Sequence, residues 1–293
     1  MLERLRNLRQ DIQEKVLDSV RAAVKAAAPS AEERDAVPRL SGRPFCDPDS
    51  KKACLTVCAP RGECTCDGPA LKEALEKALA EYGLAIPVGE AKTGCSGRCT
   101  LGPFVGFPQK GFFYLRVAPE AAREVVRETL CRGRILFPYL SVNPDRSYRT
   151  DILYDRFSGL LAAIDDTVCM VDVARYFLAF EEGLSCGKCV PCRLGIKRME
   201  ESLDRIVAGQ GTMEDLEQIG LLCETMIYAP HCQFAMASTK PVLSAVTYFK
   251  DEFVEHIEKK ECRAGVCTAL VEIQKKKAFR ERMAEAAKKK KKK

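Results

Sequence analysis

Several features that define other classes of protein are missing from this 293-residue sequence. No apolar stretch approaches the roughly 20 residues that a membrane-spanning helix needs. The N-terminus is charged and amphipathic, so we expect no secretory signal peptide. Basic patches with interleaved aromatic residues are also missing, which argues against binding to nucleic acid. The sequence therefore predicts a cytoplasmic protein with no transmembrane segment.

The sequence also has no glycine-rich loop of the kind that holds nucleotide phosphates. Such loops join a strand to the N-terminus of a helix, where free N–H groups and the helix dipole meet the negative charge. The 19 glycines lie mostly in turns and beside cysteines, and no segment shows that order of elements. We therefore expect the chain alone to bind neither FMN nor NAD.

The net charge of +6 comes from the C-terminal lysine run 288–293. Without these six, the 47 lysines and arginines fall to 41, which equals the 41 acidic residues. A basic tail can bind nucleic acid or anionic lipid. A solubilising extension is the more common case, and we interpret the tail as disordered at its end.

What the sequence does have is 16 cysteines. Cysteine-rich chains without a secretory signal are usually kept reduced, and their thiolates bind metals or metal clusters. Apolar periodicity divides the chain into a small α/β domain and an all-α helical bundle, so the predicted fold class is α+β with several domains. The predicted segments are an amphipathic helix and linker over 1–50, the α/β domain over 51–137, a connector over 138–165, the helical domain over 166–270, and the basic tail over 271–293.

Within these segments, apolar spacing and terminator residues predict individual elements. Gly83 lies where a glycine commonly ends a helix. The expected helices are 1–28, 71–82, 119–130, 169–181, 192–208, 213–228 and 240–258, and the expected strand is 111–117.

The strongest motif is Cys186, Cys189 and Cys192 in a C-x2-C-x2-C run. One short loop can present three thiolates at this spacing to a 4Fe-4S cluster, while the fourth ligand comes from elsewhere in the chain. A zinc site more often uses two separated C-x2-C pairs. The candidates for the fourth ligand are Cys223, on the apolar face of a helix, and Cys232, in a loop between helices.

A second set of cysteines lies in two loops of the α/β domain, with two thiolates available for each iron of a 2Fe-2S cluster. Gly94 and Gly97 permit the tight turns that bring backbone close to the sulfur atoms. Zinc is the alternative occupant, and Cys54 and Cys66 lie close enough in sequence to replace a member of the first pair. The predicted ligands are Cys58, Cys64, Cys95 and Cys99.

A third set has the composition of a Cys3His zinc site. The alternative is a group of buried thiols and a surface histidine without metal. The predicted ligands are Cys169, His256, Cys262 and Cys267.

The segments 167–177 and 185–195 resemble the helical iron–sulfur domain of the NADH-oxidising flavoprotein subunits. These subunits occur in respiratory complex I, electron-bifurcating hydrogenases and NAD-dependent formate dehydrogenases. In that family the fourth cysteine lies nine residues before a Pro-Val pair. Cys232 and Pro241-Val242 match this spacing and Cys223 does not, so the resemblance implies Cys232 as the fourth ligand.

Residues 58–137 resemble the thioredoxin-like 2Fe-2S ferredoxin domain that is fused to such subunits in hydrogenases. The matching pieces are 93–99 and 102–105. Hydrogenase-type subunits also carry a zinc site whose Cys, His, Cys, Cys order matches the third set. The first cysteine pair departs from the family, because five residues separate Cys58 from Cys64 where the family usually has four.

The larger departure lies between the two domains. The family inserts flavin- and NADH-binding and ubiquitin-like domains there, whereas this chain has only the 28 residues 138–165. The resemblance therefore implies a non-catalytic iron–sulfur subunit that relays single electrons between other redox subunits of a complex. The alternatives are a shortened NADH dehydrogenase flavoprotein subunit and a structural protein with zinc at all three sites.

Overall fold

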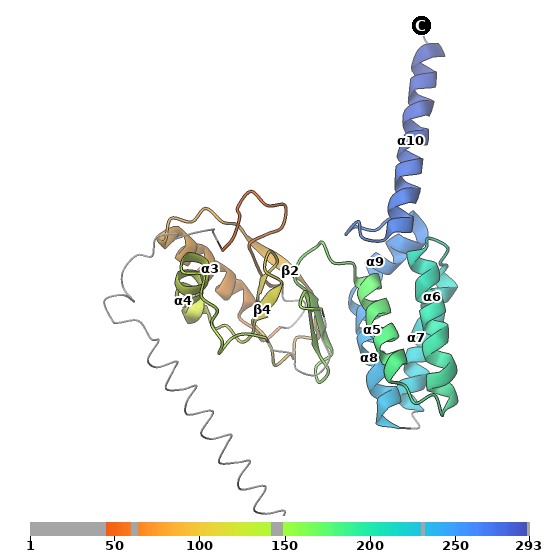
Figure 1. The fold of residues 1–293 in the computed structure, drawn as a ribbon, viewed down its shortest axis with the longest axis horizontal. Coiled ribbons are helices and arrows are strands. Elements are labelled where there is room, and N and C mark those ends of the chain that lie inside the picture. The colour runs from red at the N-terminus through yellow and green to blue at the C-terminus, as the bar shows by residue number, and fades with distance from the viewer. Residues whose placement is uncertain (1–44, 60–63, 142–148, 230–231, 292–293) are drawn as a thin grey trace, which may run out of the picture. The chain divides into compact units, whose positions relative to one another are not determined.

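The structure is a computed structural model that describes residues 45–59, 64–141, 149–229 and 232–291. The chain divides into two compact units, 1–39 and 40–293, and all of the described residues belong to the second unit. The helix predicted over 1–28 lies outside the described residues. The described part combines a β-sheet with many helices, so the predicted α+β class is confirmed (Figure 1).

Six strands form one mixed sheet in the order β4-β3-β1-β2-β6-β5. β1 and β2 pair in parallel, and the other neighbouring strands pair antiparallel. The strands are β1 (Leu55–Cys58), β2 (Val88–Gly94), β3 (Val105–Phe107), β4 (Phe112–Tyr114), β5 (Ile152–Asp155) and β6 (Leu160–Ala163).

The strand predicted over 111–117 is shorter in the structure, where it is β4. Arg116 interrupts the extended backbone with a φ of +54°, and its N–H donates to the carbonyl of Leu101 rather than to a strand. β5 and β6 were not predicted, since they fall inside the connector 138–165. β6 is the run Leu-Leu-Ala-Ala and is buried throughout, so it lacks the alternating pattern that marks a half-buried strand.

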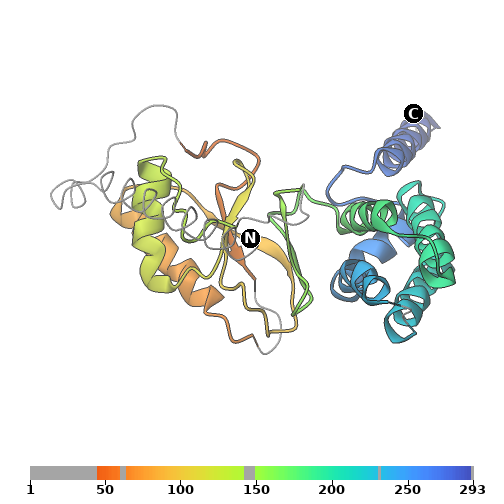
Figure 2. The same ribbon diagram turned by 60° about the horizontal axis from the view of Figure 1, so that its bottom comes forward.

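The segment between β1 and β2 contains α3 (Gly68–Glu81), close to the predicted helix 71–82. Pro69 lies in its first turn, and Gly83 follows its end with a φ of +67°, as expected of a terminating glycine. After β4 the chain forms a second helical stretch, which lies beside α3 (Figure 2). This stretch consists of the 3-10 helix η1 (Pro119–Ala121), the short α-helix α4 (Ala122–Glu124) and the π-helix η2 (Val125–Cys131).

From residue 170 onward the described chain is mainly helical. Three of the predicted helices begin and end within a few residues of α5, of η3 with α6, and of α7. The elements are α5 (Met170–Leu184), η3 (Pro191–Ile196), α6 (Lys197–Val207), α7 (Met213–Tyr228), α8 (Gln233–Tyr248), α9 (Lys250–Val254), η4 (Glu255–Lys259) and α10 (Thr268–Lys291).

The predicted helix 240–258 differs from the structure at its start and in its middle. α8 begins at Gln233 and contains Pro241 in its interior, and a break at Phe249 separates it from α9. Proline lacks an N–H and usually marks the first turn of a helix, which is why the sequence pattern favoured a start near Pro241. The helix continues on both sides of the proline, where Ala235, Val242 and Ala245 are buried.

Within the predicted tail 271–293, α10 continues as a helix through Lys291, and residues 292–293 lie outside the described residues. Leu270 near the start of α10 is buried in the core, whereas residues 279–285 are exposed. Alanine, glutamate, lysine and arginine dominate the later turns and are good helix formers, which favours a helix there without burial. No helix among the described residues is both long enough and apolar enough to cross a membrane.

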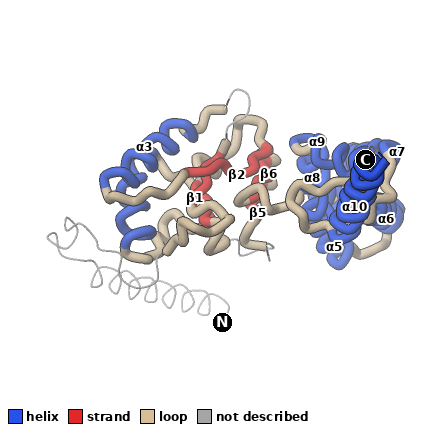
Figure 3. The backbone as a smooth tube through the Cα atoms, turned by 90° about the horizontal axis from the view of Figure 1, so that it is seen from above, coloured by secondary structure: helices blue, strands red, loops and turns tan. Residues whose placement is uncertain are grey.

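The buried apolar residues form two clusters. One lies between α3, η2 and the sheet, and includes Leu71, Phe107 and Tyr114. The other begins at the sheet with Cys58, Cys95 and Leu161 and continues without interruption through the helices. The β5–β6 hairpin lies next to β2 and leads directly into α5, which makes this continuous core possible (Figure 3).

Candidate metal centres

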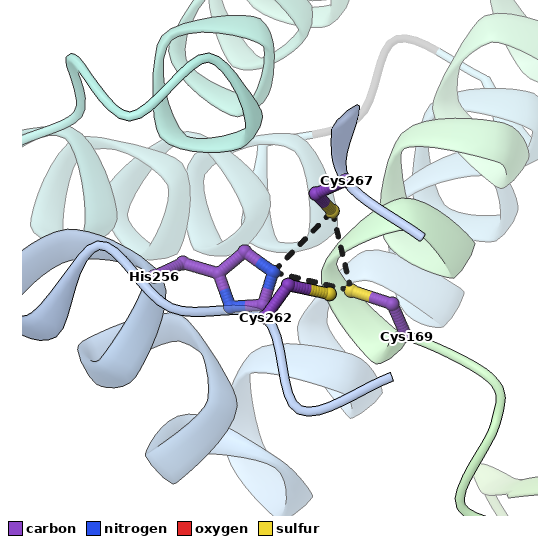
Figure 4. A group of neighbouring side chains, drawn as sticks. All are labelled: Cys169, His256, Cys262 and Cys267. Carbon is purple, nitrogen blue, oxygen red and sulfur yellow. Dashed lines mark hydrogen bonds between the residues drawn. The ribbon is translucent and has the colours of Figure 1, made fainter. Parts of the chain in front are cut away.

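The structure brings together the four residues of the predicted Cys3His site (Figure 4). Cys169 immediately precedes α5, His256 belongs to η4, and the other two lie in the loop before α10. Their ligand atoms all lie within 4.8 Å of one another. All four residues are buried, with relative exposures of 1% for Cys169 and His256, 3% for Cys267 and 9% for Cys262.

The separations between ligand atoms match the edges of a zinc tetrahedron. With ordinary bond lengths, two sulfurs on one zinc lie about 3.8 Å apart, and a sulfur and a nitrogen about 3.5–3.6 Å apart. The Sγ atoms of Cys169 and Cys267 are 3.8 Å apart. His256 Nε2 lies 3.3 Å from Cys169 Sγ and 3.5 Å from Cys267 Sγ. These three separations are therefore compatible with one tetrahedral metal ion such as zinc, and those to Cys262 are at most 4.8 Å.

Local structure orients these ligands. His256 Nδ1 lies 2.7 Å from the carbonyl oxygen of Glu252, which favours a proton on Nδ1 and leaves Nε2 free to bind a metal. Gly265, with a φ of +67°, allows the chain to turn between Cys262 and Cys267, and its N–H donates to the carbonyl of Cys262 at 3.0 Å. Both thiols thereby face the imidazole.

The electrostatics of the site also favour a cation. Hydrogen bonds with Cys169 and Cys267 hold the pKa of Cys262 well below its usual range. Burial lowers the pKa of His256, but hydrogen bonds with Cys169 and Cys262 outweigh it and raise this pKa to about 10. Hydrogen bonds with Cys262 and Cys267, together with burial, raise the pKa of Cys169. Three thiols this close cannot all ionise without a positive charge between them, and a divalent metal supplies one.

The C-x2-C-x2-C loop lies between α5 and α6 and is much more open. Cys186 is exposed, Cys189 is half-buried, and Cys192, in η3, is buried. Gly187 has a φ of +64°, which lets the loop reverse direction between the first two thiols. A backbone N–H of Cys192 holds the pKa of Cys189 below its usual range, the effect that a thiolate ligand requires.

The two candidates for the fourth ligand lie in different surroundings. Cys232 is exposed at the start of α8. Burial and the neighbouring Cys189 raise the pKa of Cys192 to about 11, and the charge of Cys232 adds to this rise. Cys223 is fully buried in α7, with Sγ 3.5 Å from Met199 Sδ. Cys223 thus lies in the helical core, whereas Cys232 is exposed and affects Cys192 through its charge. Among the described residues, the structure brings ligand atoms of three or more histidine, cysteine or acidic side chains within 4.8 Å of one another only at the Cys3His site.

The four cysteines predicted for the 2Fe-2S site lie around the ends of β1 and β2. Cys58 is the last residue of β1, and Cys95 directly follows β2. Burial raises the pKa of Cys58 to about 11. A backbone N–H of Phe104 opposes this rise, and the charges of Cys64 and Cys99 add to it. The N–H of Gly97 points at Cys95 Sγ at 3.2 Å, in the manner of amides around cluster sulfurs.

A fifth thiol belongs to this group. Cys66 Sγ lies 3.6 Å from Cys99 Sγ, and the N–H of Cys66 donates to Cys64 Sγ at 3.4 Å. Gly102 packs against these two sulfur atoms and leaves no room for a side chain, because a Cβ there would lie 2.6 Å from Cys66 Sγ and 3.1 Å from Cys99 Sγ. Sequence spacing had indicated Cys66 only as a possible substitute in the first pair.

Cys54, the other possible substitute, lies elsewhere. Its Sγ accepts from Gln109 Nε2 at 3.2 Å, and burial raises its pKa. Cys54 and Cys46 belong to the apolar cluster beneath α3, whereas Cys58 and Cys95 belong to the cluster that continues into the helices. The surroundings of Cys54 therefore favour a buried, unligated thiol.

Residues 172–256 match the family described as the NADH-ubiquinone oxidoreductase-F iron-sulfur binding region. The predicted resemblance of the helical part to the iron–sulfur domain of these subunits is confirmed. The matched residues include the cysteine loop, Cys232 and His256, but neither the sheet nor the other three ligands of the Cys3His site.

Among curated proteins, the chain is 42% identical over 114 residues to the NADP-reducing hydrogenase subunit HndC of Solidesulfovibrio fructosivorans, covering 39% of this chain and 23% of that one. It is 38% identical over 105 residues to the F 2 subunit of the NADH-quinone oxidoreductase of Rhizobium meliloti (strain 1021), covering 36% and 25%. The chain thus spans about a quarter of the length of these relatives. A solved NAD+-reducing [NiFe]-hydrogenase in the H2-reduced state aligns at 28% identity with a TM-score of 0.31, over 33% of this chain and 16% of that one.

Proposed function

We propose that this chain is a non-catalytic iron–sulfur subunit that relays single electrons between redox centres of partner subunits. The observation that carries the proposal is the cysteine loop of the helical part, which lies with Cys232 inside the stretch that matches an iron–sulfur binding region. The proposed 4Fe-4S ligands are Cys186, Cys189, Cys192 and Cys232. The exposure of Cys186 and Cys232 leaves a cluster here accessible to a partner's redox centre.

A 2Fe-2S cluster on Cys58, Cys64, Cys95 and Cys99 is the second proposed centre. The sheet around it has a parallel β1–α3–β2 unit followed by the antiparallel strands β3 and β4. This arrangement supports the thioredoxin-like fold that the resemblance implies. The close contact of Cys66 with Cys99 makes Cys66 a neighbour of the cluster, and the ligand set stays with the four cysteines.

The proposed occupant of the Cys3His site is a structural zinc. Its four protein ligands leave no position open for a substrate, which is typical of structural zinc sites. The start of α5 and the loop before α10 are far apart in sequence, and zinc would join them. The five segments 1–50, 51–137, 138–165, 166–270 and 271–293 stand as the proposed domain organisation, with β5 and β6 added within the third.

The named relatives are components of a hydrogenase and of an NADH-quinone oxidoreductase. We therefore place the chain in a multi-subunit redox complex, in the cytoplasm, where partner subunits supply the flavin or the terminal active site. The competing function is that of a shortened NADH dehydrogenase flavoprotein subunit. The short segment between the two proposed domains argues against it, because even one βαβ unit needs about 30 residues.

The test is anaerobic purification of the full chain followed by analysis of iron, sulfide, zinc and flavin. We expect a brown protein with about six iron atoms, two from a 2Fe-2S and four from a 4Fe-4S cluster, one zinc and no FMN. NADH-dependent reduction of a dye should be absent, with or without added FMN. Robust turnover with FMN would favour the flavoprotein alternative, and a colourless protein with zinc at all three sites would favour the structural one.

A further inference from the structure

A buried ion pair connects the sheet to the Cys3His site. Lys92 lies in β2, three residues before Cys95, and its Nζ is 2.8 Å from Glu252 Oε1 in α9. Only 9% of the lysine side chain and 5% of the glutamate side chain are exposed. The same ammonium group donates a second hydrogen bond, of 2.7 Å, to the carbonyl of Val168.

Both partners of Lys92 lie beside metal-site residues. Val168 precedes Cys169, and the N–H of Met170, on its other side, donates to Glu252 Oε2 at 3.1 Å. The carbonyl of Glu252 is the group that lies 2.7 Å from His256 Nδ1. Lys92 and Glu252 thereby fix the backbone around one thiol ligand and the ring orientation of the imidazole ligand.

The surroundings make this pair sensitive to change. The apolar cluster continues from the sheet into the helices around it. The two parts are also in close contact nearby, because a Cβ on Gly94 would lie 2.5 Å from Tyr248 Cβ. If the ammonium group is removed, the Glu252 carboxylate loses its charged partner in this environment, which is strongly unfavourable. The carboxylate must then move, which breaks its contact with the N–H of Met170 beside Cys169 and disturbs the residue whose backbone carbonyl orients His256.

We infer that Lys92 is a positioning residue for the Cys3His metal site, supplied by the strand that leads to the Cys95 loop. The inference rests on the proposal that this site binds zinc. Outer partners that hold metal-ligating side chains commonly change metal affinity 10–100-fold when they are replaced. Lys92 lies one step further from the metal, since it acts through Glu252 and the backbone of residues 168–170, so we expect an effect at the lower end of this range.

The experiment measures zinc affinity of the full chain by competition with a chromophoric chelator, and the visible spectrum after Co2+ substitution. Lys92→Met should weaken zinc binding about 10-fold and alter the cobalt bands. The matched control is Lys72→Met, because Lys72 pairs at 3.1 Å with Glu90 on the same strand but at the surface, with 34% and 61% of the side chains exposed. The control should keep the affinity and spectrum of the original chain.

Lys92→Arg keeps a cation for Glu252 and a donor for Val168, so it should bind zinc more tightly than Lys92→Met. Equal weakening in both would indicate lost packing and contradict the inference, as would unchanged affinity and spectrum in Lys92→Met. If Lys92→Met is insoluble, the double variant Lys92→Met/Glu252→Gln is measured instead, because it leaves no unpaired charge. An unchanged zinc affinity in the double variant would also contradict the inference. Failure of the proposed zinc site itself would appear earlier, as no zinc in the unaltered chain.

Discussion

The two cysteine sites of the helical part differ most in their exposure. All four residues of the Cys3His site are buried, and their ligand atoms already lie at separations suited to one metal ion. Among the four cysteines proposed for the 4Fe-4S cluster, Cys186 and Cys232 are exposed and only Cys192 is buried. One chain thus contains a closed site and an open one within the same set of helices.

This difference separates two roles for thiolates. A closed site with four protein ligands contributes its binding free energy to folding and admits no further reactant. An open site tolerates solvent near its sulfur atoms, and solvent exposure is one of the factors that set the reduction potential of a cluster. We therefore expect loss of the first site to affect stability and loss of the second to affect electron transfer.

The largest expected effect is that of Cys262→Ala, which removes one ligand of the closed site. Structural zinc contributes on the order of 10 kcal/mol to folding in small zinc domains, so we expect loss of zinc and unfolding of helices in the helical part. Circular dichroism during heating, with zinc analysis, measures this. Cys186→Ala at the open site is the matched control and should leave zinc and helix content unchanged. Equal helix loss in both variants would remove the distinction between the sites.

The next effect concerns the fourth ligand at the open site. Cys232→Ala should remove the 4Fe-4S cluster or convert it to a 3Fe-4S form, because the loop alone supplies three thiolates. Cys223→Ala should keep the cluster, since Cys223 Sγ packs against Met199. Electron paramagnetic resonance of the reduced and oxidised proteins distinguishes the forms. The opposite pattern would reassign the fourth ligand to Cys223.

A smaller change is expected at the fifth thiol of the sheet. Cys66→Ser should retain the 2Fe-2S cluster but shift its reduction potential, because Cys66 Sγ lies 3.6 Å from the proposed ligand Cys99. Cys64→Ser should lose the cluster or alter its spectrum strongly. Redox titration followed by visible absorption measures both. A stable, unaltered cluster in Cys64→Ser together with its loss in Cys66→Ser would assign the ligand to Cys66.

The smallest expected effect lies away from both sites of the helical part. Thr212 caps α7, with its hydroxyl accepting from the N–H of Asp215 and the Asp215 carboxylate accepting from the N–H of Thr212 at 2.9 Å. Thr212→Ala should lower the free energy of unfolding by about 1 kcal/mol. Zinc and iron contents should not change. A loss of metal in this variant would mean that α7 supports a site more directly than its contacts indicate.

Much of the helical part could be predicted because its apolar residues recur at helical spacing. α5 and α7 begin and end close to the predicted bounds. β5 and β6 could not be predicted, because each is only four residues long and the hairpin that they form is held to the sheet by the pairing of β6 with β2, which is distant in sequence. The interior position of Pro241 in α8 was missed for a related reason, since burial of its neighbours outweighs the local preference of proline.

The sequence by itself determined which residue types are available for metal chemistry and how they are spaced along short loops. A C-x2-C-x2-C run predicts three ligands because a short loop restricts where its thiols can point. The tertiary structure alone decided how thiols far apart in sequence are grouped. Cys66 joins Cys99 and Cys54 joins the core beneath α3, because the positions of the loops depend on the packing of β1, β2 and α3. The Lys92–Glu252 pair depends on packing in the same way, since its two residues are separated by 160 positions.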